Sequence, residues 1–390
     1  MVIVGSGTRF LSGISYYTWH LSRALSPRFE VSTVLMRRLL PVALYPGRAR
    51  VDVELSGLSY DGIGPCFDGV DWYLVPSLPR ATRFLDAARP DVLILQWWTG
   101  TVALPYLVLA RAAARRGAHV VIEFHEVLDT AEQRIPFVSR YVAAMMHQLL
   151  RVASGLVVHS DHDRALMAAH YELPTVPVAV VGHGPYSHYD GGGATLRREA
   201  PADVWNILFF GTIRPYKGLE YLVEAFSALP DPERYWLTVV GETWEGWNLP
   251  AELIAASPVR DRITFVNRYV SDDELGEWIA GADAAVLPYL RSSASGPLHT
   301  VMHHGLPVVV TSVGGLVEAA AAYAGAVFVP PADAGAIGAA LAGIAADSKG
   351  RRHEDPSSWE RTVAGYEELL DGMAAGTGAP RSSSEPAPRS

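Results

Sequence analysis

Arg214 and Lys217 follow a short apolar run, residues 208–210, and a glycine, at a point where a helix is expected to begin. The free N–H groups and the dipole of a helix N-terminus attract anions. Cations in a first helical turn interact unfavourably with that dipole, and a bound anion offsets this cost. A guanidinium holds two oxygens at once, and an ammonium adds a point charge. The spacing therefore predicts a clamp for a diphosphate, with ordinary surface cations as the alternative.

The scarcity of lysine makes Lys217 more informative. Only two of the 32 basic residues are lysines, Lys217 and Lys349, and the rest are arginines. We interpret the arginine excess as compositional bias. A lysine that is kept at a motif position in such a chain points to a specific role.

A second anion site is predicted after the apolar run 286–289. Gly296 allows close approach of the backbone, and Pro297 suits the first position of a helix. The Ser295 hydroxyl and the amides near Leu298 could then hold a phosphate. A plain capped turn between strand and helix is the alternative.

Histidines stand at the ends of several expected strands. His125 ends the run 120–124, where residues of a ligand cleft are expected, although a structural histidine is equally consistent with the pattern. His159 and His183 occupy similar positions. His299 and His303 have the spacing of the helical zinc-protease motif, but the glutamate that this motif needs is Thr300 here. We predict no metal site and place His299 and His303 on a helix surface.

The N-terminal Gly5-Ser6-Gly7 follows a strand and partly matches the dinucleotide-binding fingerprint. Phe10 stands where the third glycine belongs, and residues 35–38 end the second strand without an acidic residue for a ribose. An NAD site is therefore disfavoured. Arg37 and Arg38, at the end of the second strand, leave an NADP site as an alternative. Gly13, at the start of the following helix, would let the backbone approach a ligand.

Composition excludes several classes of protein. A net charge of −9 over 390 residues argues against a nucleic-acid partner. Cys66 is the only cysteine, which excludes disulfides within the chain and cysteine-based zinc sites. The start MVIVGSG lacks the features of a signal peptide, so we expect a cytoplasmic protein. A weak peripheral contact with the inner membrane face stays an alternative. It would depend on four arginines that lie among apolar residues: Arg37, Arg38, Arg48 and Arg50.

Apolar runs that alternate with helical patterns must position these residues. Such alternation predicts parallel sheets covered on both faces, with ligands at the carboxyl ends of the strands. The expected strands are 2–4, 31–35, 92–95, 120–124, 156–158, 178–181, 207–210, 237–240, 263–265, 284–287 and 308–310. The expected helices are 13–25, 103–116, 136–152, 162–170, 216–228, 272–280, 297–304, 314–323, 334–346 and 358–373.

The predicted fold class is α/β, with two doubly wound Rossmann-like domains facing a central cleft. The first domain spans 1–183 and the second 204–357, joined by a Gly-rich polar linker at 184–203. An amphipathic helix follows at 358–375. The Ser/Pro-rich tail 376–390 has a disordered composition.

Taken together, these segments resemble the family 4 glycosyltransferases of the GT-B architecture. The resemblance covers most of residues 1–373 and depends on the order and spacing of several short motifs. They are the loop and helix at 12–17, Gly211 through Gly218, Arg268-Tyr269-Val270 followed by Ser271-Asp272-Asp273-Glu274, Ala282-Asp283, and residues 305–318.

The resemblance implies that a sugar moves from a nucleotide-diphosphate sugar to a hydroxyl of an unidentified acceptor, with retention at the anomeric carbon. It implies no metal and no further cofactor, and a final helix that crosses back to the first domain. Arg214 and Lys217 would hold the diphosphate, with Gly13 contacting it from the first domain and His125 near the sugar. Further donor contacts would come from the turn and helix residues Ser295, Gly296, Pro297, Leu298 and Thr300, and from Arg268, Tyr269 and Val270 beside the base.

Two departures from the family pattern stand out. Many members carry two glutamates eight positions apart, which contact the sugar and the ribose; here those positions are Ser292 and Thr300. Thr212 stands where many relatives have the arginine that appears here as Arg214. The missing glutamates leave open a catalytically weak nucleotide-sugar-binding protein, and a GT-B sugar-nucleotide epimerase is a further alternative.

Overall fold

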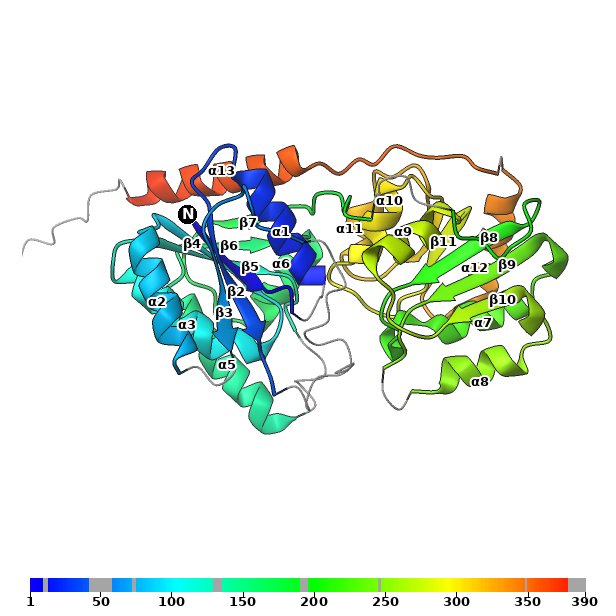
Figure 1. The fold of residues 1–390 in the computed structure, drawn as a ribbon, viewed down its shortest axis with the longest axis horizontal. Coiled ribbons are helices and arrows are strands. Elements are labelled where there is room, and N and C mark those ends of the chain that lie inside the picture. The colour runs from blue at the N-terminus through cyan, green and yellow to red at the C-terminus, as the bar shows by residue number, and fades with distance from the viewer. Residues whose placement is uncertain are drawn as a thin grey trace, which may run out of the picture.

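Two parallel β-sheets, each covered on both faces by helices, lie side by side (Figure 1). The computed structural model describes residues 1–9, 13–41, 58–71, 75–128, 135–189, 196–244, 247–347 and 349–377. None of the described helices combines the length and apolarity needed to cross a membrane. The predicted fold class is confirmed.

The first domain contains a seven-stranded sheet of order β3-β2-β1-β4-β5-β6-β7. Its five inner strands are mostly buried, which explains their continuous apolar runs. Its elements are β1 (Val2–Ser6), α1 (Gly13–Leu25), β2 (Ser32–Arg38), β3 (Cys66–Asp71), α2 (Ser77–Ala88), β4 (Val92–Trp97), α3 (Ala103–Ala114), β5 (His119–Phe124), α5 (Pro136–Leu150), β6 (Gly155–Val158), α6 (Asp161–His170) and β7 (Val178–Val180).

The second domain contains a six-stranded sheet of order β10-β9-β8-β11-β12-β13. Helices α7, α8 and α12 cover one face, and α9, α10 and α11 cover the other. Its elements are β8 (Trp205–Phe210), α7 (Leu219–Ser227), β9 (Tyr235–Val240), α8 (Leu249–Ala256), β10 (Ile263–Val266), α9 (Asp272–Ala280), β11 (Ala284–Leu287), α10 (Gly296–His303), β12 (Val308–Thr311), α11 (Leu316–Ala320), β13 (Ala326–Val329) and α12 (Ala334–Ala345).

The final helix, α13 (Trp359–Thr377), returns to the first domain, as the resemblance implied (Figure 1). Tyr366 packs into the same buried cluster as Ile3 and Tyr17 on the α1 face of the first sheet. The Trp359 indole N–H donates to the Pro185 carbonyl oxygen at 2.9 Å. Helix α13 is therefore part of the core of the first domain. The helix includes residues 376 and 377, and the rest of the predicted tail lies outside the described residues.

Edge elements account for most of the differences from the sequence prediction. Strand β3 lies where no strand was predicted, because the sequence CFDGVD mixes polar residues and glycine with only partial burial. Strand β13 and helices α2 and α8 were also not expected. In β13, the run Ala326–Val329 sits on the sheet edge and is mostly exposed or half-buried. Short, partly exposed elements of this kind carry a weak periodic signal.

Candidate functional site

A pocket of about 830 Å³, partly open to solvent, lies between the two domains at the carboxyl ends of their strands. The sequence-predicted residues among its walls are Gly13, Lys217, Tyr269, Val270, Gly296, Pro297 and Thr300. The other lining residues are Tyr16, Tyr186, Tyr189, Phe210, Gly211, Thr212, Val240, Gly241, Glu242, Asp272 and Leu275.

Lys217 is held in this wall by a tight turn. The sequence placed it in the first turn of a helix, but it closes a single 3₁₀ turn, Pro215–Lys217, ahead of α7. Gly218 then turns the chain with φ of 64°, and a Cβ there would lie 2.0 Å from the Pro288 carbonyl oxygen. The turn therefore requires glycine. A Cβ on Gly211 would lie 3.2 Å from the Lys217 Nζ, so the ammonium reaches back to the end of β8.

The Lys217 ammonium is buried without an acidic partner. Only 7% of the residue is exposed, and no carboxylate among the described residues forms an ion pair with it. Its Nζ lies 5.2 Å from the centre of the Tyr289 ring. Burial, with a smaller contribution from Arg214, lowers the pKa of Lys217 to about 7. A buried cation without a counter-ion is costly, and a bound anion would remove that cost.

Arg214 does not line the pocket. Its guanidinium lies over the Trp244 ring, 3.5 Å from the ring centre. It is close enough to Lys217 to lower the pKa of that residue. The two predicted cations are therefore neighbours, but Lys217 alone faces the pocket directly.

Three more predicted residues point elsewhere. Arg268 is exposed and pairs with Glu274, with two N–O distances of 2.6 and 2.9 Å. The Ser295 hydroxyl caps α10 by accepting from the Leu298 amide at 3.3 Å, which was the alternative for this turn. The Leu298 side chain is completely buried in the core. Gly296 and Pro297 are the residues of this turn that line the pocket.

Two acidic pocket residues were missed by the sequence prediction. Glu242 follows the carboxyl end of β9, and Asp272 begins α9. Burial raises the pKa of Asp272 to about 6, although a hydrogen bond from the Tyr16 hydroxyl at 2.6 Å opposes the shift. Applying the strand-end rule to every strand would have found Glu242. The pairing of Tyr16 with Asp272 joins the two domains across 256 positions, a separation that leaves no local signal.

A second contact closes the domains onto each other. The Glu318 carboxylate, on α11 of the second domain, accepts from the backbone N–H groups of Asp161 and His162 at 2.6 and 2.8 Å. These amides form the N-terminus of α6 in the first domain. Polar contacts therefore join the two domains both inside and outside the pocket.

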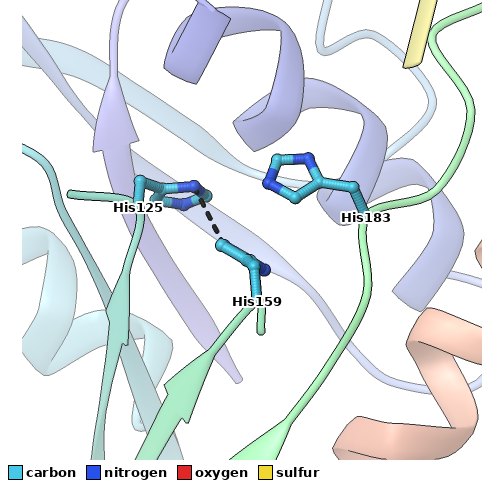
Figure 2. Close-up of side chains that lie close together, drawn as sticks. All are labelled: His125, His159 and His183. Atoms are coloured by element: carbon cyan, nitrogen blue, oxygen red, sulfur yellow. Dashed lines mark hydrogen bonds between the residues drawn. The ribbon is translucent and has the colours of Figure 1, made fainter. Parts of the chain in front are cut away.

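The histidines that follow the strand ends come together at one place in the first domain (Figure 2). The His125 Nδ1 lies 3.1 Å from the His159 Nε2, and the His183 ring centre lies 4.2 Å from that of His159. Adjacent parallel strands bring these residues to one edge. His299 corrects the sequence prediction: it is buried rather than on a helix surface, and it stacks on His183 with ring centres 4.9 Å apart.

Burial and mutual repulsion make most of this cluster neutral. Burial, followed by His125, lowers the pKa of His159 to about 4. The pKa of His183 is also well below the ordinary value, and that of His299 falls to about 3, in both cases mainly because of burial. Burial alone would raise the pKa of Glu123, but His125, His159 and the Tyr17 hydroxyl together lower it to about 2.

Family models match both halves of the chain. Residues 12–184 match the glycosyl transferase 4-like domain, and residues 205–347 match glycosyl transferases group 1. The two regions together span about four-fifths of the sequence. The chain belongs to the family 4-like glycosyltransferases. This places the predicted diphosphate clamp and second anion turn within the group 1 domain.

Curated relatives of this family 4-like chain include D-inositol 3-phosphate glycosyltransferases. The protein of that name from Streptomyces avermitilis is 28% identical over 79% of this chain and 66% of its own length. The one from Geodermatophilus obscurus is 32% identical over 58% of this chain and 55% of its own length. The chain thus spans 55% and 66% of the length of these two curated relatives.

Solved structures share the fold of this family 4-like chain along nearly its whole length. Sucrose-phosphate synthase from Thermosynechococcus elongatus superposes with a TM-score of 0.64 at 17% identity, covering 97% of this chain and 96% of its own. Anabaena HepE in complex with UDP gives a TM-score of 0.62 at 13% identity, covering 96% of this chain and 99% of its own. At these identities the likeness concerns the fold alone.

Proposed function

We propose that the protein transfers a sugar from a nucleotide-diphosphate sugar to a hydroxyl of an acceptor, with retention at the anomeric carbon and without an organic cofactor. The observation that carries the proposal is the buried Lys217 ammonium, which faces the interdomain pocket with no acidic partner among the described residues. A donor diphosphate would supply the missing negative charge. Curated relatives are named as glycosyltransferases, and HepE binds UDP, in keeping with such a donor.

The proposed chemistry follows from where charge develops. Negative charge builds on the diphosphate as the bond between sugar and phosphate breaks, and preorganised positive groups stabilise it. Lys217 would contact these oxygens directly. Arg214, whose guanidinium lies over the Trp244 ring, would add to the positive electrostatic potential at the diphosphate. We propose front-face attack by the acceptor hydroxyl, with a leaving-group phosphate oxygen taking its proton.

Lys217→Ala tests the clamp. The probe is slow hydrolysis of a panel of nucleotide sugars, which requires no acceptor, read as released nucleoside diphosphate. Removing a preorganised charge of this kind is expected to lower the rate about 10²–10³-fold. Lys349→Ala is the matched control, because this second lysine bonds the Ala202 and Val204 carbonyls away from the pocket. An unchanged rate in Lys217→Ala would refute the clamp.

The anomeric configuration of the released sugar tests retention. Proton NMR of the first product should show the configuration of the donor sugar, and the opposite anomer would contradict a retaining reaction. Nucleoside diphosphate that is never released would favour the sugar-binding alternative raised by Ser292 and Thr300. An epimerised nucleotide sugar formed without an acceptor would favour an epimerase.

We further propose that no metal ion bridges the diphosphate, because Lys217 supplies positive charge at that place. Adding Mg²⁺ to metal-free protein should then leave the hydrolysis rate unchanged. A strong dependence on Mg²⁺ would show that the protein's own cations are insufficient.

We separately propose that the basic segment of the first domain makes a peripheral contact with anionic lipid. Arg37 is engaged in a two-bond pair with Asp71, and Arg48 and Arg50 lie outside the described residues. Co-sedimentation with vesicles containing anionic phospholipid at low salt tests it. Protein that stays in the supernatant would refute the contact.

A further inference from the structure

We propose that His125, His159 and His183 form a binding site for one divalent transition-metal cation, of which Zn²⁺ is the best match. Each residue follows a different strand end of the first sheet, and Figure 2 shows the three rings gathered at one place. The site is distinct from the diphosphate clamp, which belongs to the second domain. It also differs from the pair His299 and His303, for which the sequence predicts no metal.

The spacing of the ligand atoms fits a small tetrahedral ion. One nitrogen from each of the three rings lies within 4.8 Å of the others. The His125 Nδ1 and the His159 Nε2 lie 3.1 Å apart. With Zn–N bonds of about 2.0–2.1 Å, two ligand nitrogens in a tetrahedral site lie about 3.3 Å apart. Small side-chain adjustments would complete the geometry.

His159 is already oriented as a metal ligand. Its Nδ1 lies 2.9 Å from the Val181 carbonyl oxygen, which can only accept, so this nitrogen carries the proton. The lone pair is therefore on Nε2, which faces the cluster. Metal-binding histidines in proteins are commonly fixed in this way by a backbone carbonyl or a carboxylate.

The cluster contains buried nitrogens that the described protein leaves unsatisfied. Both ring nitrogens of His183 and the Nε2 of His125 have no hydrogen-bond partner within the described part of the chain. Both residues are less than a tenth exposed. Unpaired buried polar atoms are uncommon in folded proteins and often mark a missing water or ion. A metal ion would accept a lone pair from each ring.

Charge also favours a cation here. The Glu123 carboxylate is fully buried, and its oxygens lie 3.7 Å from the Nε2 atoms of both His125 and His159. Tyr17 donates to it at 2.6 Å, but no lysine or arginine of the described residues pairs with it. A divalent cation on the neighbouring imidazoles would balance this carboxylate.

The donor set selects the class of metal. Three imidazoles suit Zn²⁺, Co²⁺ or Cu²⁺, whereas Mg²⁺ and Ca²⁺ prefer oxygen. Three protein ligands also leave one coordination position for water or a substrate hydroxyl, as in catalytic rather than structural zinc sites. The inference concerns binding alone and stands whether or not the protein transfers sugars.

Titration of metal-free full-length protein tests the site. Calorimetry with Zn²⁺ should give one ion per chain, and Co²⁺ should give the intense visible absorption of a four-coordinate site. His183→Ala and His159→Ala should each weaken Zn²⁺ binding at least about tenfold, as even loss of an outer partner does in known sites. His147→Ala is the matched control, because His147 is exposed on α5 outside the cluster.

A second pair of measurements guards against misfolded variants. Circular dichroism checks each variant, and His183→Gln replaces the ring with a side chain that retains polarity. Zn²⁺ should raise the melting temperature of the native protein but not that of His183→Gln. Absence of saturable binding to native protein at micromolar Zn²⁺ would overturn the proposal. Equal affinity in the native protein and both cluster variants would also overturn it. Neither result would bear on donor hydrolysis, which is measured separately.

Discussion

Lys217 combines three properties that rarely coincide in one side chain: it is buried, unpaired with any acid of the described residues, and in the wall of a pocket. Its lowered pKa of about 7 follows mainly from that burial. A diphosphate stabilises the ammonium form, so binding should raise the pKa again. Burial makes the unliganded side chain easy to deprotonate. For the same reason, a bound anion should have a large effect on its protonation.

A pH dependence of donor binding follows. As the pH rises through about 7, unliganded Lys217 loses its proton and binding must restore it, so affinity should fall by up to about tenfold per pH unit. Calorimetry of a nucleotide sugar between about pH 6 and 9, in buffers of different ionisation enthalpy, should detect proton uptake at the alkaline end. Lys217→Arg keeps its charge and should show a flatter profile. A flat profile for the native protein would contradict the role of Lys217.

At the scale of elements, α13 is a structural part of the first domain rather than an appendage. Tyr366 is fully buried in the cluster with Ile3 and Tyr17. The Thr362 hydroxyl also donates to the Gly182 carbonyl oxygen at 2.9 Å. Because Tyr17 lies in both the α13 cluster and the histidine surroundings, the docking of α13 also supports the position of the imidazoles.

Tyr366→Ala should therefore destabilise the first domain. Truncating a large buried aromatic side chain costs about 3–5 kcal/mol, through lost burial and the cavity left behind. Thermal or urea unfolding should show this loss, while Glu368→Ala, at an exposed position of the same helix, should change stability by less than about 0.5 kcal/mol. A loss below about 1 kcal/mol in Tyr366→Ala would mean that α13 docks only weakly.

Elements and sites were predictable from sequence to different degrees. Strand β8 and the segment from Gly211 to Lys217 were found because a continuous buried run ends in a glycine and two cations. The pocket positions of Gly13 and Gly296 followed from the strand-end rule. Strand β3 was missed because its polar residues and glycine interrupt the run of apolar residues that predicts a strand.

The histidine cluster could not be predicted as a unit. His125, His159 and His183 converge only because β5, β6 and β7 are neighbours, a strand order that local patterns do not contain. The burial of His299 depends on how the second domain closes on the first. Contacts made by closure, such as Tyr16 with Asp272, have no counterpart in local sequence.

At the scale of the whole molecule, polar contacts join the two domains both outside and inside the pocket. Glu318 bonds the free amides of the α6 N-terminus, where the helix dipole also favours a negative charge. Tyr16 and Asp272 form the other fastening inside the pocket. A donor must therefore enter a cleft whose closure depends partly on one carboxylate outside the pocket.

Glu318→Gln should shift the unliganded protein toward more open arrangements. The substitution removes a charge from two hydrogen bonds at a helix N-terminus, a loss of about 1–2 kcal/mol. Small-angle X-ray scattering without donor should show a larger radius of gyration than for the native protein. Glu224→Gln, on the exposed side of α7, is the control and should match native scattering. Identical curves for all three proteins would show that Glu318 does not govern closure.

The return of α13 has a consequence for dissecting the molecule. The chain passes from the first domain to the second between Val181 and Val204 and returns between Ala346 and Ser358, so the second domain is a continuous insertion within the first. A fragment of residues 196–347 leaves both cores of the second domain whole. A fragment that stops before Trp359 deprives the first domain of a helix from its own core. The two halves are therefore unequal as expression units: we expect the second to fold alone, and the first only when α13 is supplied with it.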